Sequence, residues 1–217
     1  MNGLVRTVYR AGSGEITEKK SRFIASAVPV KTEEEALEFI ASVRKKYWDA
    51  RHNCYAYIIG EHGETMRSSD DGEPSGTAGK PILEILLAEN LTDTAVVVTR
   101  YFGGILLGTG GLVRAYSSAA HEALSASVII EKKHGIRCLI RTNYTDLGKV
   151  QYHLAQNGIP VLETNYTDDV SFEVIMPDEK KKQVLSVLTE ATAGRTDITE
   201  TEELWFGEHD GEVCIWD

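Results

Sequence analysis

Residues with the potential for chemistry gather in two glycine-rich loops near the middle of the chain. The second loop, Gly103–Gly111, directly precedes an apolar segment that is typical of a helix start. Free N–H groups at a helix start bind anions, and two arginines flank this loop. The loop is therefore either a phosphate site, for RNA or a nucleotide, or a turn that lets strand and helix pack closely. The candidate anion-binding residues are Arg51, Arg100, Gly108, Gly110, Gly111 and Arg114.

The first loop, Gly72–Gly79, is acidic at its start. Asp70, Asp71 and Glu73 place three carboxylates within four residues, and hard cations bind such oxygens. However, the twelve-residue calcium pattern is missing, and no histidine pair supports a transition metal. We therefore predict no metal and no cofactor, and expect a shaped turn whose acidic residues face Arg51, Arg100 or a partner.

A catalytic pair could involve His52 and Cys54. His52 could act as a general base or orient the Cys54 thiol as a nucleophile. The two residues are two positions apart on an expected strand, and no third, orienting group can be named, which favours a structural histidine. The candidate polar site is therefore His52, Asp70, Asp71 and Glu73, with no catalytic residue assigned.

Aromatic residues near this histidine offer another possibility. They could stack nucleic-acid bases, although aromatic residues on a strand-rich surface more often belong to the core. The residues concerned are Tyr47, Trp48, Tyr55 and Tyr57.

Size and composition indicate a globular protein with two cores. The chain has 217 residues, of which 42% are hydrophobic and 26% charged. No apolar run approaches the roughly 20 residues that span a bilayer, and the first residues lack a signal-peptide core. We therefore expect a cytoplasmic protein with no membrane contact, whose three cysteines are separate thiols.

The charge is unevenly distributed. The net charge is −10, with 16 basic and 17 acidic residues up to Gly135 (a net of −1) and 7 and 16 from Ile136 onward (a net of −9). An acidic region repels phosphate backbones, so any nucleic acid should bind the first part of the chain.

The pattern of elements predicts an α+β fold with two domains. In residues 1–130 we expect strands at 5–10, 20–30, 54–60 and 94–101, and helices beginning at Thr32 and near residues 82 and 111. Residues 128–135 are expected to form a hinge. Residues 136–206 have the order β-α-β-β-α-β of a ferredoxin-like domain, with Thr145 and Asp178 capping its helices, and residues 207–217 are expected to form an acidic surface tail.

Three segments resemble signatures of the YigZ/IMPACT family, namely 51–56 (RHNCYA), 70–81 (DDGEPSGTAGKP) and 98–116 (VTRYFGGILLGTGGLVRAY). The resemblance to two-domain bacterial members implies a first domain like domain 2 of ribosomal protein S5. It also implies a second domain like a ferredoxin-like module of translation elongation factors. Eukaryotic relatives regulate translation in the stress response by binding an activator of an eIF2 kinase. The family offers no catalytic residues to carry over.

These observations lead to one preferred function and two alternatives. The preferred function is a non-enzymatic cytoplasmic regulator of translation that binds the ribosome, RNA or a translation-associated protein. Its contact surface would be the glycine-rich face of the first domain, with flanking charges at Lys19, Lys20, Arg22 and Arg51. The alternatives are an enzyme acting on a small phosphorylated or nucleotide ligand and a protein-protein interaction module. The sequence leaves the oligomeric state open.

Overall fold

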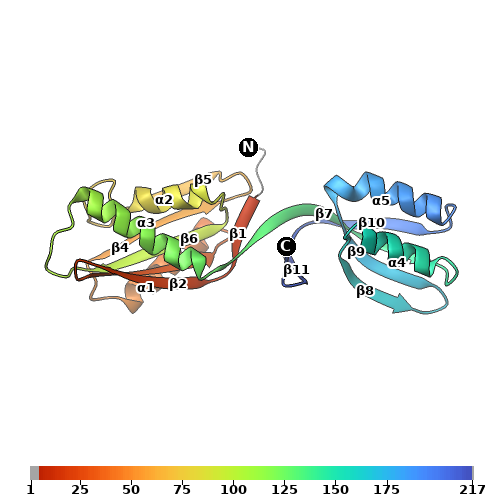
Figure 1. The fold of residues 1–217 in the computed structure, drawn as a ribbon, viewed down its shortest axis with the longest axis horizontal. Helices are drawn as coiled ribbons and strands as arrows, with labels where there is room; N and C mark the ends of the chain where they lie inside the picture. Colours follow the sequence, from red (N-terminus) through yellow and green to blue (C-terminus); the bar gives the residue numbers. More distant parts are fainter. Residues whose placement is uncertain (1–4, 217) are drawn as a thin grey trace. The chain divides into compact units, whose positions relative to one another are not determined.

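The chain forms two α+β units. The computed structural model describes residues 5–216, and contacts divide the chain into Met1–Glu131 and Lys132–Asp217. Each unit combines an antiparallel sheet with helices, so the predicted α+β class with two domains is confirmed (Figure 1).

The first unit is built on a five-stranded sheet in which every pair of neighbouring strands is antiparallel. A further strand, β1 (Val5–Arg10), pairs with β7 (Val128–Thr142). The strands at 5–10, 20–30, 54–60 and 94–101 were predicted, whereas the outer strands β2 and β5 were not. The sheet order is β2 (Gly12–Glu18), β3 (Ser21–Pro29), β6 (Thr94–Tyr101), β4 (His52–Ile59) and β5 (Thr65–Ser69).

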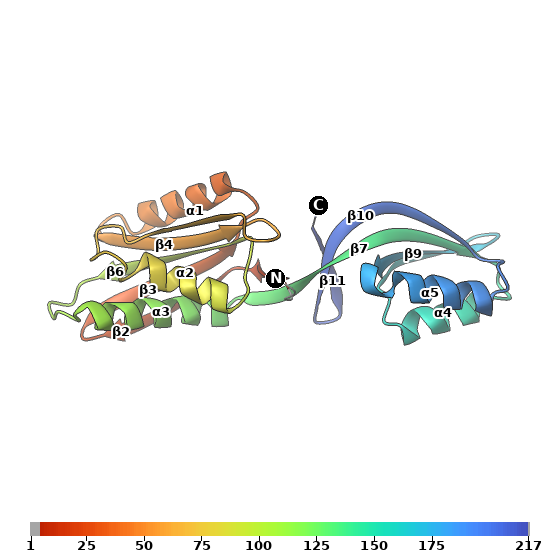
Figure 2. The same cartoon turned by 90° about the horizontal axis from the view of Figure 1, so that it is seen from above.

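Helices cover both faces of this sheet. The helix α1 (Glu33–Lys46) lies on one face, and α2 (Gly79–Ala88) and α3 (Thr109–Ser125) lie on the other (Figure 2). The central strand β6 is therefore buried on both sides. Val96 and Val98 pack towards α2 and α3, while Ala95 and Val97 pack towards α1. Burial on both faces explains the continuous apolar run of this strand.

Two local features of the sequence account for the start of α1 and for the packing of β2. Thr32 caps α1 as predicted, because its hydroxyl accepts the Glu35 N–H at 3.2 Å and the Glu35 carboxylate accepts the Lys31 N–H at 2.6 Å. The strand β2 packs against α3 through glycine. A Cβ at Gly12 would stand 2.5 Å from the Ala123 carbonyl oxygen. These glycines hide the strand from a propensity-based prediction, since glycine is depleted in strands.

The second unit has the predicted ferredoxin-like arrangement. The order β10-β7-β9-β8 places the first and third strands of the motif side by side in the centre, with every neighbouring pair antiparallel. Both helices lie on one face of this sheet (Figure 1). The remaining elements are α4 (Leu147–Gln156), β8 (Val161–Tyr166), β9 (Val170–Pro177), α5 (Asp178–Ala191), β10 (Asp197–His209) and β11 (Glu212–Trp216).

Several boundaries in this part differ from those predicted. Residues 128–135, expected as a hinge, lie in β7, and the division between the two units falls within them, after Glu131. The expected tail is a hairpin, since β11 pairs with β10 and the Lys132 ammonium lies over the rings of Trp205 and Trp216. The helix α4 begins after Asp146 rather than after Thr145, and Asp178 is the first residue of α5 rather than its cap. The hairpin depends on strand pairing and on ring contacts between residues far apart in the sequence. A prediction from local sequence patterns therefore misses it.

Candidate binding surface of the first unit

The acidic loop is folded around the carboxylate of Asp70. That carboxylate accepts backbone N–H groups from Gly76 at 2.8 Å and from Ala78 and Gly79 at 2.9 Å each. Burial acts to raise the pKa of Asp70, but these bonds outweigh it and hold the pKa below its ordinary value. The helix α2 has no side-chain cap at Ala78, so Asp70 serves as its cap from eight residues upstream.

Asp71 ties the same loop to two other elements. One carboxylate oxygen accepts the Asn53 N–H of β4 at 2.7 Å, and the other pairs with the Arg44 guanidinium of α1 at 2.7 Å. The Asp71 carbonyl oxygen lies 2.9 Å from Nδ1 of His52. The His52 ring is therefore bound to the backbone of the loop rather than to the Cys54 thiol.

A buried chain of polar side chains lies beneath the loop. Glu73 Oε1 pairs with the Arg100 guanidinium at 2.6 Å and accepts the Tyr116 hydroxyl at 2.8 Å. The Arg100 and Glu73 side chains are only 7% and 4% exposed, so the pair is almost fully removed from water. The Cys54 thiol continues the chain, because it lies 3.4 Å from the Tyr116 oxygen and donates to the Asp70 carbonyl at 2.9 Å.

Burial also decides the chemistry of Cys54 and Tyr116. Desolvation raises the pKa of the Cys54 thiol to about 12, and together with Cys54 and Glu73 it raises the pKa of Tyr116 as well. Since the thiolate is the nucleophile, a neutral buried thiol is unsuited to covalent catalysis. Tyr116 was not predicted as part of this cluster. Its position on the apolar face of α3 was the one feature of the sequence that indicated a buried hydroxyl.

The placement of Arg100 corrects the sequence-based expectation of a surface anion site flanked by two arginines. Arg100 is 6% exposed and lies opposite Phe23 and His52 in the sheet register. Its guanidinium lies 5.4 Å from the ring centroid of Phe23 and 5.5 Å from that of Phe102. The acidic loop faces this arginine because burying its charge requires a buried counter-charge, which Glu73 provides.

The glycine loop presents the start of α3 to solvent. The capping residue Gly108 has a φ of +74°, provides no side-chain cap, and is followed by a first turn without an acidic residue. Gly108, Thr109 and Gly110 are exposed, and Gly111 is half-buried. The exposed Arg114 folds back towards this turn, with one guanidinium nitrogen 3.7 Å from the position that a Cβ at Gly110 would occupy.

Other exposed side chains lie at the same end of the first unit. The hydroxyl of Tyr101 donates to the Asp49 carboxylate at 2.7 Å and so joins the end of β6 to the segment after α1. Gly103 lies against the backbone of Lys20, in the turn between β2 and β3. We call this region the end surface, and it comprises Lys19, Lys20, Lys45, Lys46, Trp48, Arg51, Phe102, Ile105, Leu106, Gly108, Gly110, Gly111 and Arg114.

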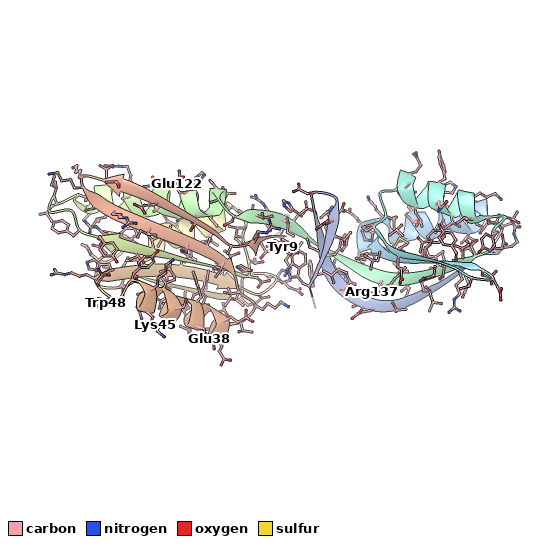
Figure 3. All side chains as sticks on the ribbon, turned by 90° about the horizontal axis from the view of Figure 1, so that it is seen from below. Tyr9, Glu38, Lys45, Trp48, Glu122 and Arg137 are labelled. Atoms are coloured by element: carbon pink, nitrogen blue, oxygen red, sulfur yellow. The ribbon has the colours of Figure 1, made fainter. Side chains whose placement is uncertain are left out.

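The aromatic residues singled out in the sequence divide into two groups. Tyr57 is 2% exposed and Tyr55 is half-buried, and both pack in the core beneath α1. Trp48 instead projects at the end of α1 and is 83% exposed (Figure 3). Phe102 and Leu106, which were not predicted as surface features, are 53% and 82% exposed.

Within residues 5–216, no group of three or more histidine, cysteine or acidic side chains is arranged to hold a metal ion. No helix in the same range is both long and apolar enough to cross a membrane. The candidate polar residues His52, Asp70, Asp71 and Glu73 do come together, with His52 at the start of β4 bonded to the acidic loop that carries the other three.

The sequence is similar to those of known protein families. A family model described as the Impact N-terminal domain matches residues 19–124, and one described as Domain of unknown function (DUF1949) matches residues 140–195. IMPACT family member YvyE of Bacillus subtilis (strain 168) is 44% identical over 196 residues, which cover 90% of each chain. The chain belongs to the IMPACT family.

Two further similar proteins extend this result. IMPACT family member YigZ of Escherichia coli (strain K12) is 35% identical over 187 residues, covering 85% of this chain and 92% of that one. A structure titled "Crystal structure of an hypothetical protein" has 32% identity and a TM-score of 0.59, covering 93% of this chain and 99% of that one. The matched Impact N-terminal domain contains both loops and the whole end surface.

Proposed function

We propose that the protein is a non-enzymatic regulator of translation in the cytoplasm that contacts the ribosome, RNA or a translation-associated protein through the end surface. Membership of the IMPACT family supports a role in translation, because the family resemblance links eukaryotic members to translational regulation. The observation that carries the choice of surface is the uncapped start of α3 beside Arg114. Exposed N–H groups there, with a cation beside them, favour a phosphate or carboxylate of the partner.

The interior of the first unit supports a non-enzymatic role. The polar groups of the family motifs bond to one another and to the backbone, which makes the acidic loop rigid. Cys54 is buried as a neutral thiol, and no activating base among residues 5–216 contacts it. These contacts account for the buried polar residues of the motifs as structural residues.

Co-sedimentation with ribosomes tests this proposal. Lysate containing the tagged protein is separated on a sucrose gradient at low salt, and we expect part of the protein to travel with ribosomal particles. The double variant Arg51→Ala, Arg114→Ala should lose most of this fraction, because both side chains are exposed cations of the end surface. The matched control is Lys182→Ala, which removes an exposed cation from α5 of the second unit. Absence from every ribosomal fraction, together with unchanged RNA affinity in the double variant, would contradict the proposal.

The same helix start favours one alternative, an enzyme that binds a small phosphorylated or nucleotide ligand. A thermal-shift screen with nucleotides, inorganic phosphate and divalent metals separates the two functions. Stabilisation by a nucleotide or phosphate that disappears in Arg114→Ala would favour the enzyme. No shift in melting temperature with any compound would favour the regulator. The other alternative, a protein-protein interaction module, predicts a defined partner in a pull-down and no affinity for RNA.

A further inference from the structure

We propose that the end surface binds single-stranded RNA, with bases stacked on Trp48 and Phe102 and phosphates held by the surrounding lysines and arginines. This inference rests on the proposed function and specifies the chemistry of its partner. It depends on three observations: a local excess of cations, exposed aromatic rings, and a hydrogen bond that joins the segments carrying these rings.

The local charge is opposite to that of the whole chain. The net charge is −10, yet the end surface carries six exposed cations, against the exposed carboxylates of Glu18 and Asp49 in the same segments. The cations are Lys19, Lys20, Lys45, Lys46, Arg51 and Arg114. Among the described residues, none of these six forms an ion pair. Arg22 and Arg44, by contrast, are paired with Glu15 and Asp71. A patch of unneutralised cations on an acidic protein attracts a polyanion to that place and repels it elsewhere.

The exposed rings distinguish this surface from a simple cationic patch. Trp48 is 83% exposed and Phe102 is 53% exposed, although burying such side chains ordinarily stabilises a fold. The Asp49–Tyr101 hydrogen bond joins the residue after Trp48 to the residue before Phe102, so both rings belong to one region. Trp48 also follows Tyr47, whose ring lies 5.1 Å from the Lys46 ammonium.

The combination of rings and cations favours an unpaired strand over a duplex. The bases of a duplex are stacked on each other, and their faces are inaccessible to protein side chains. In a single strand each base has a free face, and proteins bind such strands with aromatic platforms set in a cationic groove. Phe102 and Trp48 provide exposed rings as platforms, and the exposed lysines of the end surface provide the positive charge.

Fluorescence anisotropy of the full chain with a labelled oligouridine of about twelve nucleotides tests this inference, since that length lies within the site size of such grooves. We expect binding at low salt, with weaker binding to a duplex RNA of equal length. Trp48→Ala and Phe102→Ala should each weaken binding roughly fivefold or more, as loss of one stacked base does. The matched control, Tyr166→Ala, removes a 59% exposed aromatic ring from the second unit and should leave affinity unchanged.

Charge variants test the second half of the surface. Lys45→Ala should make the slope of log affinity against log salt shallower by about 0.7, whereas Lys182→Ala should not change it. Equal affinity for duplex and single strand, or unchanged affinity in both aromatic variants, would overturn the inference. A DNA oligonucleotide of the same length shows whether the 2′-hydroxyl contributes.

The two proposals fail in different ways. If the protein travels with ribosomes but oligouridine does not bind, the RNA inference is wrong and the proposed regulator remains. If oligouridine binds through Trp48 but no protein travels with ribosomes, the proposed contact with the ribosome is wrong instead. Circular dichroism of each variant confirms that it is folded, as we expect for side chains this exposed.

Discussion

The two loops of the first unit are both rich in glycine but have opposite arrangements. In the acidic loop, Asp70 caps α2 and Glu73 pairs with a buried arginine, so its charges face the protein. In the glycine loop, the start of α3 has no side-chain cap, and Leu106 and Phe102 face solvent. A helix start that has its own carboxylate is satisfied internally, whereas one without it retains N–H groups for a ligand.

The comparison therefore separates a structural motif from a candidate binding motif. Substitutions in the acidic loop should mainly change the free energy of unfolding, and substitutions in the glycine loop should mainly change binding. Substitutions in both loops test this separation.

The largest effect is expected at the buried ion pair. Glu73→Ala leaves the Arg100 charge buried without a counter-charge and removes the acceptor of Tyr116. We expect a loss of about 3–5 kcal/mol in the free energy of unfolding, measured by urea denaturation. The control Glu84→Ala removes an exposed carboxylate on α2, paired with Lys80 at 3.7 Å, and should cost under about 1 kcal/mol. Equal losses in the two variants would contradict the structural role.

The next effect concerns the cap of α2. Asp70→Asn keeps the size of the side chain but removes the charge that accepts three N–H groups, and should cost about 1–2 kcal/mol at neutral pH. Because folding lowers the pKa of Asp70, its contribution is present above the unfolded-state pKa and is lost as the pH falls through the folded-state pKa. Unfolding measured from neutral pH into this acidic window should show the variant and the parent converging. A constant difference would contradict the assigned ionisation.

A smaller loss of stability is expected when glycine is replaced in either loop, at positions with positive φ. Gly76 and Gly104 have φ values of +74° and +84°, and a Cβ at either position would meet nothing within 4 Å. Alanine at each should therefore cost about 1 kcal/mol from backbone strain alone, as measured by denaturation. A much larger loss at one position would show that its loop contains a contact beyond the backbone requirement.

The smallest effect on stability is expected at Leu106, which is 82% exposed. Leu106→Ser should change the free energy of unfolding by less than about 0.5 kcal/mol, as is usual for exposed positions. Its matched partner in the core is Leu86→Ser, which places a hydroxyl at a 0% exposed site and should be strongly destabilising. Thermal melts of both variants provide the measurement, and a large loss at Leu106 would show that the loop packs internally.

Local sequence predicted the elements that local forces create. The cap at Thr32, the buried run of β6 and the order of the second unit follow from hydrogen bonds and side-chain periods within a few residues. Arg100 could not be placed in this way. Its position depends on the register of β6 against β3 and β4 and on a glutamate 27 residues away. The same limit applies to β11, whose pairing with β10 involves ring contacts to Lys132.

The burial of Cys54 makes the acidic loop accessible to chemical kinetics. The thiol donates to the Asp70 carbonyl and is 0% exposed, so an alkylating reagent can reach it only while the loop is detached. In the detached state the thiol recovers an ordinary pKa near 8.5 and reacts at the rate of a free cysteine. The alkylation rate of Cys54 in the folded protein is followed by mass spectrometry of the Cys54 peptide. Its ratio to the rate of a free cysteine gives the fraction of time that the loop spends open.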